Sequence, residues 1–230
     1  MSTFSPHVTT GQLGRSCPAT QPVLCQYGLD SPEQTLAEAV QAARLDLGTV
    51  LTDLQAVGPR RAAWGCLGLG ALCDALATHH ILFFHPELTH WTRQAAEVAQ
   101  APGFPAGLPD LCLALEALAH NLHTYLLKED VMLFPAIRHL EAGRGAGAAF
   151  AAHVQGPLER LSGHQADLQA AFGQLRRACG DWAPPPGAPA PLRELLAGLG
   201  ALQAATETSF QDERRLLFGP VLARFEGVTP

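Results

Sequence analysis

The chain has 230 residues, of which 47% are hydrophobic, 7% aromatic and 16% charged. It can therefore bury a hydrophobic core without disulfide bonds. Lys and Arg number 15 against 21 Asp and Glu, which gives a formal net charge of -6. Without a basic surplus to grip phosphates, a protein dedicated to nucleic acid is not expected. Ten histidines against six cysteines make histidine the reactive side chain in excess.

The cysteines and the N-terminus predict where the protein works. No two cysteines are spaced as C-x-x-C, and the N-terminus lacks a basic stretch followed by an apolar run. This pattern is typical of a cytoplasmic protein with reduced thiols. The longest apolar stretch, residues 67–76, is shorter than the ~20 residues of a bilayer span, so we expect no membrane helix.

The first part of the chain predicts a small helical domain. Strand signals are nearly absent, and Ala, Leu, Gln, Glu and Arg dominate between breakers, which favours an all-α fold. Residues 1–14 are polar and are expected to be loose. The small domain spans residues 15–58, with one helix near 18–27 and another that begins at Ser31, where Ser can cap and Pro32 fits the first helical position.

Residues 62–230 predict the main domain. Long helical stretches are separated there by Pro and Gly, over residues 66–100, 109–140, 148–179 and 191–226. We expect the first to bend at Pro86 and the third to kink or restart at Gly156-Pro157. The breakers between them are 102–103, 143–145 and 184–187. Four long helices with short connections predict an up-down-up-down four-helix bundle, whose interior often holds metal.

A weak internal repeat marks candidate site residues. The pattern E-x-x-x-L-F occurs at residues 129–134 and again 84 residues later at 213–218. The same offset pairs His80 with His164, and Tyr125 with Ser209. The bundle therefore resembles two copies of a helical hairpin, each offering a histidine on its first helix and a glutamate on its second.

Two interpretations of the repeated glutamates remain open. If Glu129 and Glu213 point inward from facing helices, together with the two histidines, they form a metal site near the bundle axis. In the alternative, both glutamates are exposed and the repeat reflects packing alone.

Several longer segments carry a family resemblance. They are residues 78–80, 87–88, 128–135, 156–158 with 164, 184–186, 212–213 and 217–218 in the main domain, and 27–30, 36–39 and 45–46 before it. Over nearly the whole chain the sequence resembles the hemerythrin-like di-iron proteins, and in particular the iron–sulfur cluster repair family. The resemblance implies a hemerythrin-like bundle in residues 62–230, preceded by that family's small leading domain.

The resemblance also implies a ligand set with departures. In that family, four histidines and two bridging glutamates hold two irons. His80 and His164 match two of the histidines, and Glu129 and Glu213 match the bridging carboxylates. Tyr125 stands at the position of one missing histidine and is a candidate ligand. Ser209 stands at the other, and His79 could replace His80 if the helix register differs by one residue.

These departures leave the cofactor open. Two histidines, two carboxylates and a phenol form an oxygen-rich site that suits non-haem iron, as one or two ions, or manganese. In the alternative, Tyr125 and Ser209 fill a decayed site that holds no metal. The leading domain of the family usually has Cys-Cys where this chain has Ser31-Pro32, so thiol-dependent behaviour is not implied.

The function implied by the resemblance is stress response or iron–sulfur cluster repair. The expected partners are small ligands such as O2 or NO, and iron–sulfur proteins, with no nucleic acid and no membrane. The competing hypothesis is a metal-free bundle that acts as a structural or regulatory interaction protein. The sequence assigns no catalytic residue and no oligomeric state.

Overall fold

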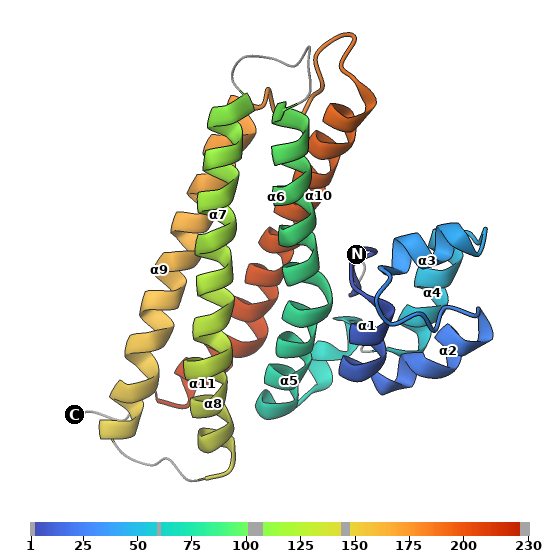
Figure 1. The fold of residues 1–230 in the computed structure, drawn as a ribbon. Coiled ribbons are helices and arrows are strands. Elements are labelled where there is room, and N and C mark those ends of the chain that lie inside the picture. The colour runs from blue at the N-terminus through green and yellow to red at the C-terminus, as the bar shows by residue number, and fades with distance from the viewer. Residues whose placement is uncertain (1–2, 59–60, 101–107, 144–147, 226–230) are drawn as a thin grey trace. The chain divides into compact units, whose positions relative to one another are not determined.

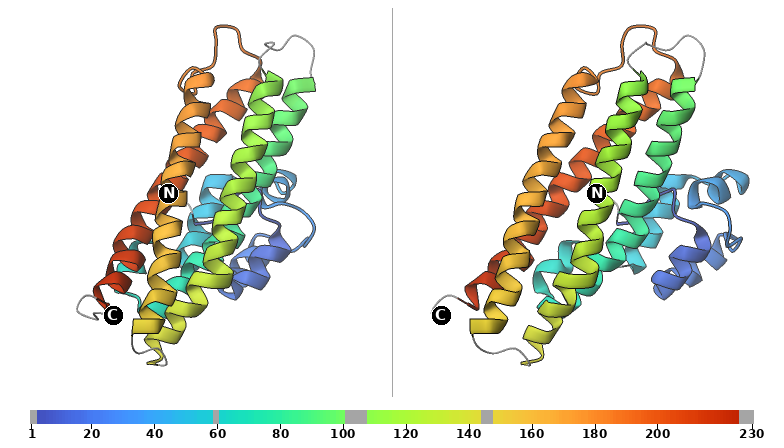
Figure 2. Two further views of the ribbon diagram at one scale, coloured as in Figure 1. Left: turned by 90° about the vertical axis from the view of Figure 1, so that its left-hand side faces the viewer. Right: turned by 60° about the vertical axis from the view of Figure 1, so that its left-hand side comes forward.

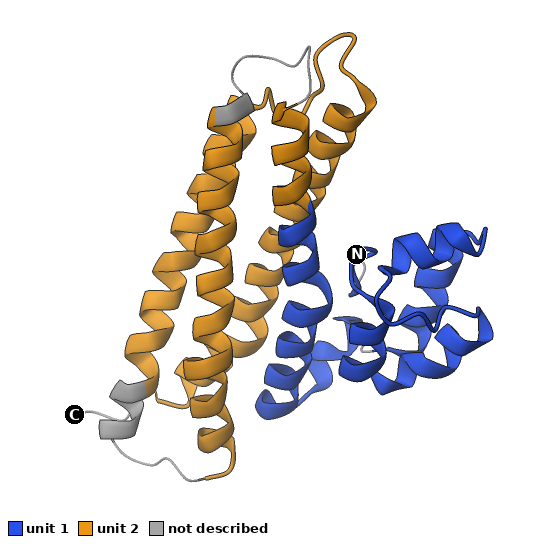
Figure 3. Cartoon of the chain, viewed as in Figure 1, with its two compact units in different colours: residues 1–90 blue, residues 91–230 orange. Residues whose placement is uncertain are grey.

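The structure, a computed structural model, describes residues 3–58, 61–100, 108–143 and 148–225. Helices follow one another along these residues, and the sole extended pairing within them is an isolated bridge between Thr9 and Thr35. The predicted all-α fold is therefore confirmed. The chain divides into two compact units, residues 1–90 and residues 91–230 (Figure 3).

The first unit opens with short helices around one hydrophobic core. They are α1 (Thr10–Ser16), η1 (Pro18–Thr20), α2 (Gln21–Gln26), α3 (Leu36–Ala42) and α4 (Leu47–Val57). The core includes Phe4 and Val8, which are fully buried although the sequence predicted a loose segment over residues 1–14. Leu82, from a later helix, belongs to the same core. Apolar side chains within a polar stretch thus anchor the N-terminal segment.

The start of α3 corrects one sequence prediction. The predicted start at Ser31 is wrong, because the helix begins at Leu36 after the N-cap Thr35. The Thr35 hydroxyl accepts from the Glu38 amide at 3.3 Å, and the Thr35 amide donates to Glu38 Oε2 at 2.9 Å. These two bonds form a complete capping box. The carbonyl of Pro32 instead accepts from the Gly11 amide at 3.3 Å.

The remainder of the first unit is a long helix with a widened turn. After η2 (Arg61–Cys66) come α5 (Leu69–His79), the π turn η3 (His80–Phe84) and α6 (His85–Gln100), whose last residues belong to the second unit. The sequence predicted a bend at Pro86, and the wide turn lies immediately before that proline.

The second unit consists mainly of long helices that run side by side. They are α7 (Leu108–Lys128), η4 (Glu129–Leu133), α8 (Phe134–Glu141), α9 (Ala148–Ala178), α10 (Ala190–Asp212), η5 (Glu213–Phe218) and α11 (Gly219–Ala223). The helices α7, α9 and α10 alternate in direction (Figures 1 and 2). Each presents an apolar stripe at spacings of three and four residues, which places one face in a common core.

One proline and two glycines shape this unit. Pro157 lies inside the continuous helix α9, so the predicted restart does not occur. Gly187, at φ +77°, lies in the turn before α10, near its predicted start. Gly198 of α10 faces the Trp91 ring so closely that a Cβ would overlap it. The predicted breakers 102–103 and 144–145, and the predicted helix end at residue 226, lie outside the described residues.

Among the residues that the structure describes, no helix combines the length and apolarity needed to cross a membrane.

Candidate metal centre

Three π turns begin at three of the candidate ligands. The turns η3, η4 and η5 start at His80, Glu129 and Glu213. In η3 the amide of His85 donates to the His80 carbonyl, five residues earlier, where an α-helix would use four. Such wide turns within α-helices are frequent at functional sites.

A proline follows each wide turn. Pro86, Pro135 and Pro220 lie six, six and seven residues after the first residue of η3, η4 and η5. Proline has no amide hydrogen, and its ring clashes with the carbonyl four residues before it. An extra residue in the turn relieves that conflict. All three wide turns therefore share this sequence feature, a proline at or just after the end of the turn.

The helical register turns the acidic side chains inward. Along α7, Leu118, Leu122 and Tyr125 precede Glu129 at spacings of four, three and four residues, and all are at most 3% exposed. On α10 and η5, Ser209 is 0% and Glu213 is 1% exposed. Carboxylates this deeply buried need partners, because an isolated buried charge is strongly unfavourable. The alternative in which both glutamates are exposed is excluded.

The two carboxylates are linked by the hydroxyl of Tyr125. Its oxygen lies 2.9 Å from Glu129 Oε1 and 2.6 Å from Glu213 Oε2. The amide nitrogen of Gln165 donates to the same hydroxyl oxygen at 2.8 Å and to Glu213 Oε2 at 2.7 Å. We call these four residues, Tyr125, Glu129, Gln165 and Glu213, the carboxylate cluster.

Two side chains extend the carboxylate cluster. The hydroxyl of Ser209 donates to Glu213 Oε1 at 3.1 Å. The guanidinium of the exposed Arg214 donates to Gln165 Oε1 at 2.9 Å, which fixes the orientation of the amide. Gln165 thus links an arginine at the surface to the buried Tyr125 hydroxyl and the buried Glu213 carboxylate.

The protons in the carboxylate cluster can be counted. The Tyr125 hydroxyl has one hydrogen but lies within hydrogen-bond distance of two carboxylate oxygens. Burial raises the pKa of Glu129 well above its ordinary value, and the nearby Glu213 charge raises it further. Burial and both carboxylates raise the pKa of Tyr125 as well. A neutral Glu129 and a neutral phenol together satisfy the geometry.

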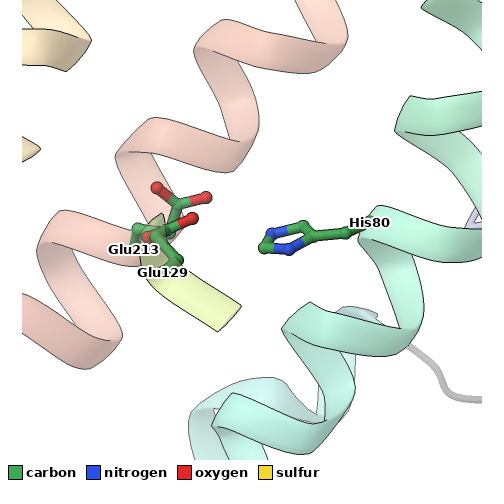
Figure 4. Close-up of side chains that lie close together, drawn as sticks. All are labelled: His80, Glu129 and Glu213. Atoms are coloured by element: carbon green, nitrogen blue, oxygen red, sulfur yellow. The ribbon is translucent and has the colours of Figure 1, made fainter. Parts of the chain in front are cut away.

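His80 is the histidine that joins the glutamates. His80, Glu129 and Glu213 each offer one ligand atom, and these atoms all lie within 4.8 Å of one another. Figure 4 shows the imidazole of His80 pointing toward the two carboxylates. His80 is 0% exposed.

The neighbouring His79 has other contacts. Its Nδ1 lies 3.3 Å from the Thr3 carbonyl oxygen, and its ring stacks on Phe83 with a centroid separation of 5.0 Å. Burial, followed by the Arg61 and His80 charges, lowers the pKa of His79 to about 3. The structure therefore groups His80, and not His79, with the glutamates.

On helix α9, Gln165 takes the inward position and His164 does not. His164 is half-buried, and its ring packs edge-on against Tyr125 with a centroid separation of 5.7 Å. Burial, and then the charge of Lys128, lower the pKa of His164. The structure does not bring His164 into the group of His80, Glu129 and Glu213.

Sequence reasoning missed Gln165, although a signal for it exists. The buried stripe of α9 runs through Leu158, Leu161, Leu168, Phe172 and Leu175. Gln165 lies four residues after Leu161 and three before Leu168, so it continues the stripe, whereas His164 is one residue off it. A polar residue on an otherwise apolar stripe predicts a buried hydrogen-bonded side chain.

Fold and site together define an all-α protein with two buried glutamates that a tyrosine hydroxyl connects. No protein-family model matches the chain. The chain is 27% identical over 215 residues to the iron-sulfur cluster repair protein YtfE of Edwardsiella ictaluri, a match that covers 90% of this chain and 93% of that protein.

Two further relatives have the same description. YtfE of Cronobacter sakazakii is 25% identical over 222 residues, covering 93% of this chain and 95% of that protein. YtfE of Salmonella paratyphi B is 23% identical over 222 residues, covering 93% and 96%. These matches confirm the predicted resemblance to the iron–sulfur cluster repair proteins over nearly the full length of the chain.

Proposed function

We propose that this protein binds non-haem iron at His80, Glu129 and Glu213 and acts in the repair of iron–sulfur clusters. The observation that carries the proposal is the convergence of one imidazole and two carboxylates, all buried, with ligand atoms within 4.8 Å of one another. The relatives named as iron–sulfur cluster repair proteins support the biological role.

The donor set fits the chemistry of iron. Imidazole nitrogen and carboxylate oxygen are ligands of non-haem iron, and no thiolate is present to favour a softer metal. Bound iron would supply coordination positions for small ligands such as O2 or NO.

The protein side chains would prepare this site in defined ways. Gln165 and Ser209 hold the Glu213 carboxylate from both oxygens, at 2.7 and 3.1 Å. Tyr125 lies between the carboxylates and keeps them together. The apolar residues along α7 and α9 exclude water. We keep Tyr125 as a candidate ligand, whereas His164 would act beside it by packing on the phenol ring.

The direct test is isosteric removal of both carboxylates. In the double variant Glu129→Gln/Glu213→Gln, we expect affinity for Fe(II) to fall at least about a hundredfold, because two anionic ligands are lost while volume is preserved. Glu116 and Glu194 lie exposed on α7 and α10, so Glu116→Gln/Glu194→Gln is a matched control that should bind iron normally. Anaerobic titration and metal analysis of the purified protein measure the outcome. Equal iron binding by both doubles would refute the site.

One observation favours a second candidate function. Hydrogen bonds from protein groups reach Glu129 Oε1 and both oxygens of Glu213. A structural or regulatory protein that binds no metal would need such a network. The melting temperature separates the two functions, because a ligand that binds the folded state raises it. If the protein binds metal as proposed, added iron or manganese should raise its melting temperature. If it is a metal-free structural or regulatory protein, the melting temperature should not change.

A further inference from the structure

The N-terminal segment from Thr3 to His7, which we call the N-terminal strap, follows the helix that carries His80. It makes four contacts with that helix within the first unit. The Thr3 carbonyl oxygen lies 3.3 Å from His79 Nδ1, and the Ser5 amide donates to the Leu82 carbonyl at 2.8 Å. The Ser5 hydroxyl donates to Glu87 Oε1 at 2.7 Å, and the His7 ring stacks on the His90 ring with 3.4 Å between centroids. These contacts begin before the wide turn η3 and end beyond it.

The bond from Ser5 to Leu82 replaces one that the helix cannot make. In a regular helix the Leu82 carbonyl would accept from the amide of residue 86, which is a proline without an amide hydrogen. The Ser5 amide donates to this carbonyl at 2.8 Å. A backbone donor from the strap therefore supplies a partner inside η3, where Pro86 has removed one.

Burial explains why a protein donor is needed at η3. Leu82 is 0% exposed, so water does not reach its surroundings. In η4 the residue at the equivalent position, four before Pro135, is Val131, which is 60% exposed. The surroundings of Val131 are therefore open to solvent. An unsatisfied buried carbonyl at Leu82 would instead destabilise the wide turn.

The strap is also fixed on its other side. The Ala37 amide donates to the Pro6 carbonyl at 2.8 Å, and just after the strap the Leu36 amide donates to the Val8 carbonyl at 2.9 Å. Phe4 is fully buried in the hydrophobic core of the first unit. The strap is thus held by the start of α3 and by its own apolar side chain, and its donor is presented in one place.

We propose that Ser5 is a positioning residue whose backbone amide stabilises the wide turn η3 and thereby sets the direction of His80. One residue of helix corresponds to about 100° of rotation, so loss of the extra residue in η3 would turn His80 relative to the helix that follows. The inference rests on the proposed function for the role of His80 as an iron ligand. Its effect on η3 does not depend on metal.

Three substitutions at one position separate the amide from the hydroxyl. Ser5→Pro removes the amide hydrogen, Ser5→Ala keeps it and removes the hydroxyl, and Ser5→Thr keeps both. In metal-free full-length protein, we expect Ser5→Pro to speed hydrogen exchange of residues 79–88 about tenfold and to shift the imidazole ¹⁵N signal of His80. Ser5→Ala should change exchange less than about threefold, and Ser5→Thr should match the wild type.

Iron affinity provides the second measurement. Anaerobic Fe(II) titration should show about tenfold weaker binding for Ser5→Pro than for the wild type. Ser5→Thr, which keeps the amide, should bind Fe(II) as the wild type does. If the wild type binds no iron, the proposed function fails, and the exchange and ¹⁵N data still decide the role of the strap. Unchanged exchange and an unchanged His80 signal in Ser5→Pro would overturn the positioning role. If the wild type binds iron, faster hydrogen exchange in Ser5→Pro together with an unchanged Fe(II) affinity would also overturn the positioning role.

A second variant covers the outcome in which Ser5→Pro does not fold. Pro86→Ala returns an amide to the helix at the position that can donate to Leu82. The restored internal bond should compete with Ser5, so the Ser5 amide should exchange about tenfold faster and the His80 signal should move. If the Ser5 amide and the His80 signal in Pro86→Ala both match the wild type, the inference is wrong.

Discussion

Helix α9 differs from the other long helices in where its proline lies. His80, Glu129 and Glu213 each precede a proline and begin a wide turn, whereas Pro157 lies seven residues before His164 and α9 continues without such a turn. At the level of the carboxylates, α9 then presents Gln165 and not His164. In the helices with wide turns the inward candidate ligand begins the turn, whereas in α9, which has no such turn, Gln165 takes the inward position.

The difference also separates two chemical roles. The helices with wide turns contribute side chains that can bind a cation. Helix α9 contributes an amide that donates hydrogen bonds to the Tyr125 hydroxyl and to Glu213. An amide nitrogen cannot act as a ligand while it donates. We therefore expect substitutions on α9 to change stability more than metal binding.

The largest expected effect tests the role of α9 directly. Gln165→Met keeps a similar shape but removes the donor to Tyr125 and Glu213, and should lower the free energy of unfolding of the metal-free protein by about 2–3 kcal/mol. Urea unfolding at neutral pH measures the change. The exposed Gln174 on the same helix is the control, and Gln174→Met should stay within about 0.5 kcal/mol. Equal effects at both positions would show that the buried amide has no special role.

A second test uses the pH dependence of Glu129 in metal-free protein. Its pKa is raised by burial above the ordinary value of 4.5. The stability that comes from the neutral acid is therefore present below about 4.5 and is lost as pH rises through the folded-state pKa, by up to about 1.4 kcal/mol per pH unit. Glu129→Gln cannot ionise, so its stability should exceed that of the wild type increasingly as pH rises. Unfolding at several pH values measures this.

The matched control for this test lies on the same helix. Glu116 is exposed, so Glu116→Gln should follow the wild type across the pH range. A constant difference between Glu129→Gln and the wild type at every pH would contradict the raised pKa.

The smallest expected effect concerns His164. His164→Ala removes an edge contact with the Tyr125 ring and should lower stability by about 0.5–1 kcal/mol, with iron content unchanged. His164→Phe keeps a ring and should restore stability. If His164→Ala loses iron as fully as Glu129→Gln/Glu213→Gln, then α9 also supplies a metal ligand. The distinction between a hydrogen-bonding α9 and the ligand-bearing helices with wide turns would then be wrong.

Much of the fold was predictable from the amino-acid composition and from the positions of the helix-breaking Pro and Gly residues. The absence of strand patterns predicted the all-α fold, and the E-x-x-x-L-F repeat predicted the two glutamates that prove to be buried. The start of α3 was missed because Ser31 and Thr35 are both plausible caps. The choice between them depends on the Pro32 carbonyl, which accepts from Gly11 far away in sequence.

The site was predicted less completely than the fold, because the helical register decides which residue of each helix points inward. The repeat pairs His80 with His164, but the extra residue in η3 has no counterpart at this point of α9. The inward position shifts by one residue, to Gln165. A comparison of sequence offsets cannot detect a turn of five residues where four are usual. The proline that follows each wide turn is the signal that could have revealed it.

The hydrogen bonds of Tyr125 have a consequence for the proposed binding of a cation. The phenol hydrogen, and the acid hydrogen of Glu129 when that group is neutral, lie between the carboxylates, so a cation bound there must displace at least one hydrogen. The centre would then work as an exchanger of protons for metal. Loading should acidify a weakly buffered solution, and acid should favour release. Both the pH of the solution and the concentration of metal would then determine what fraction of the protein holds a metal ion.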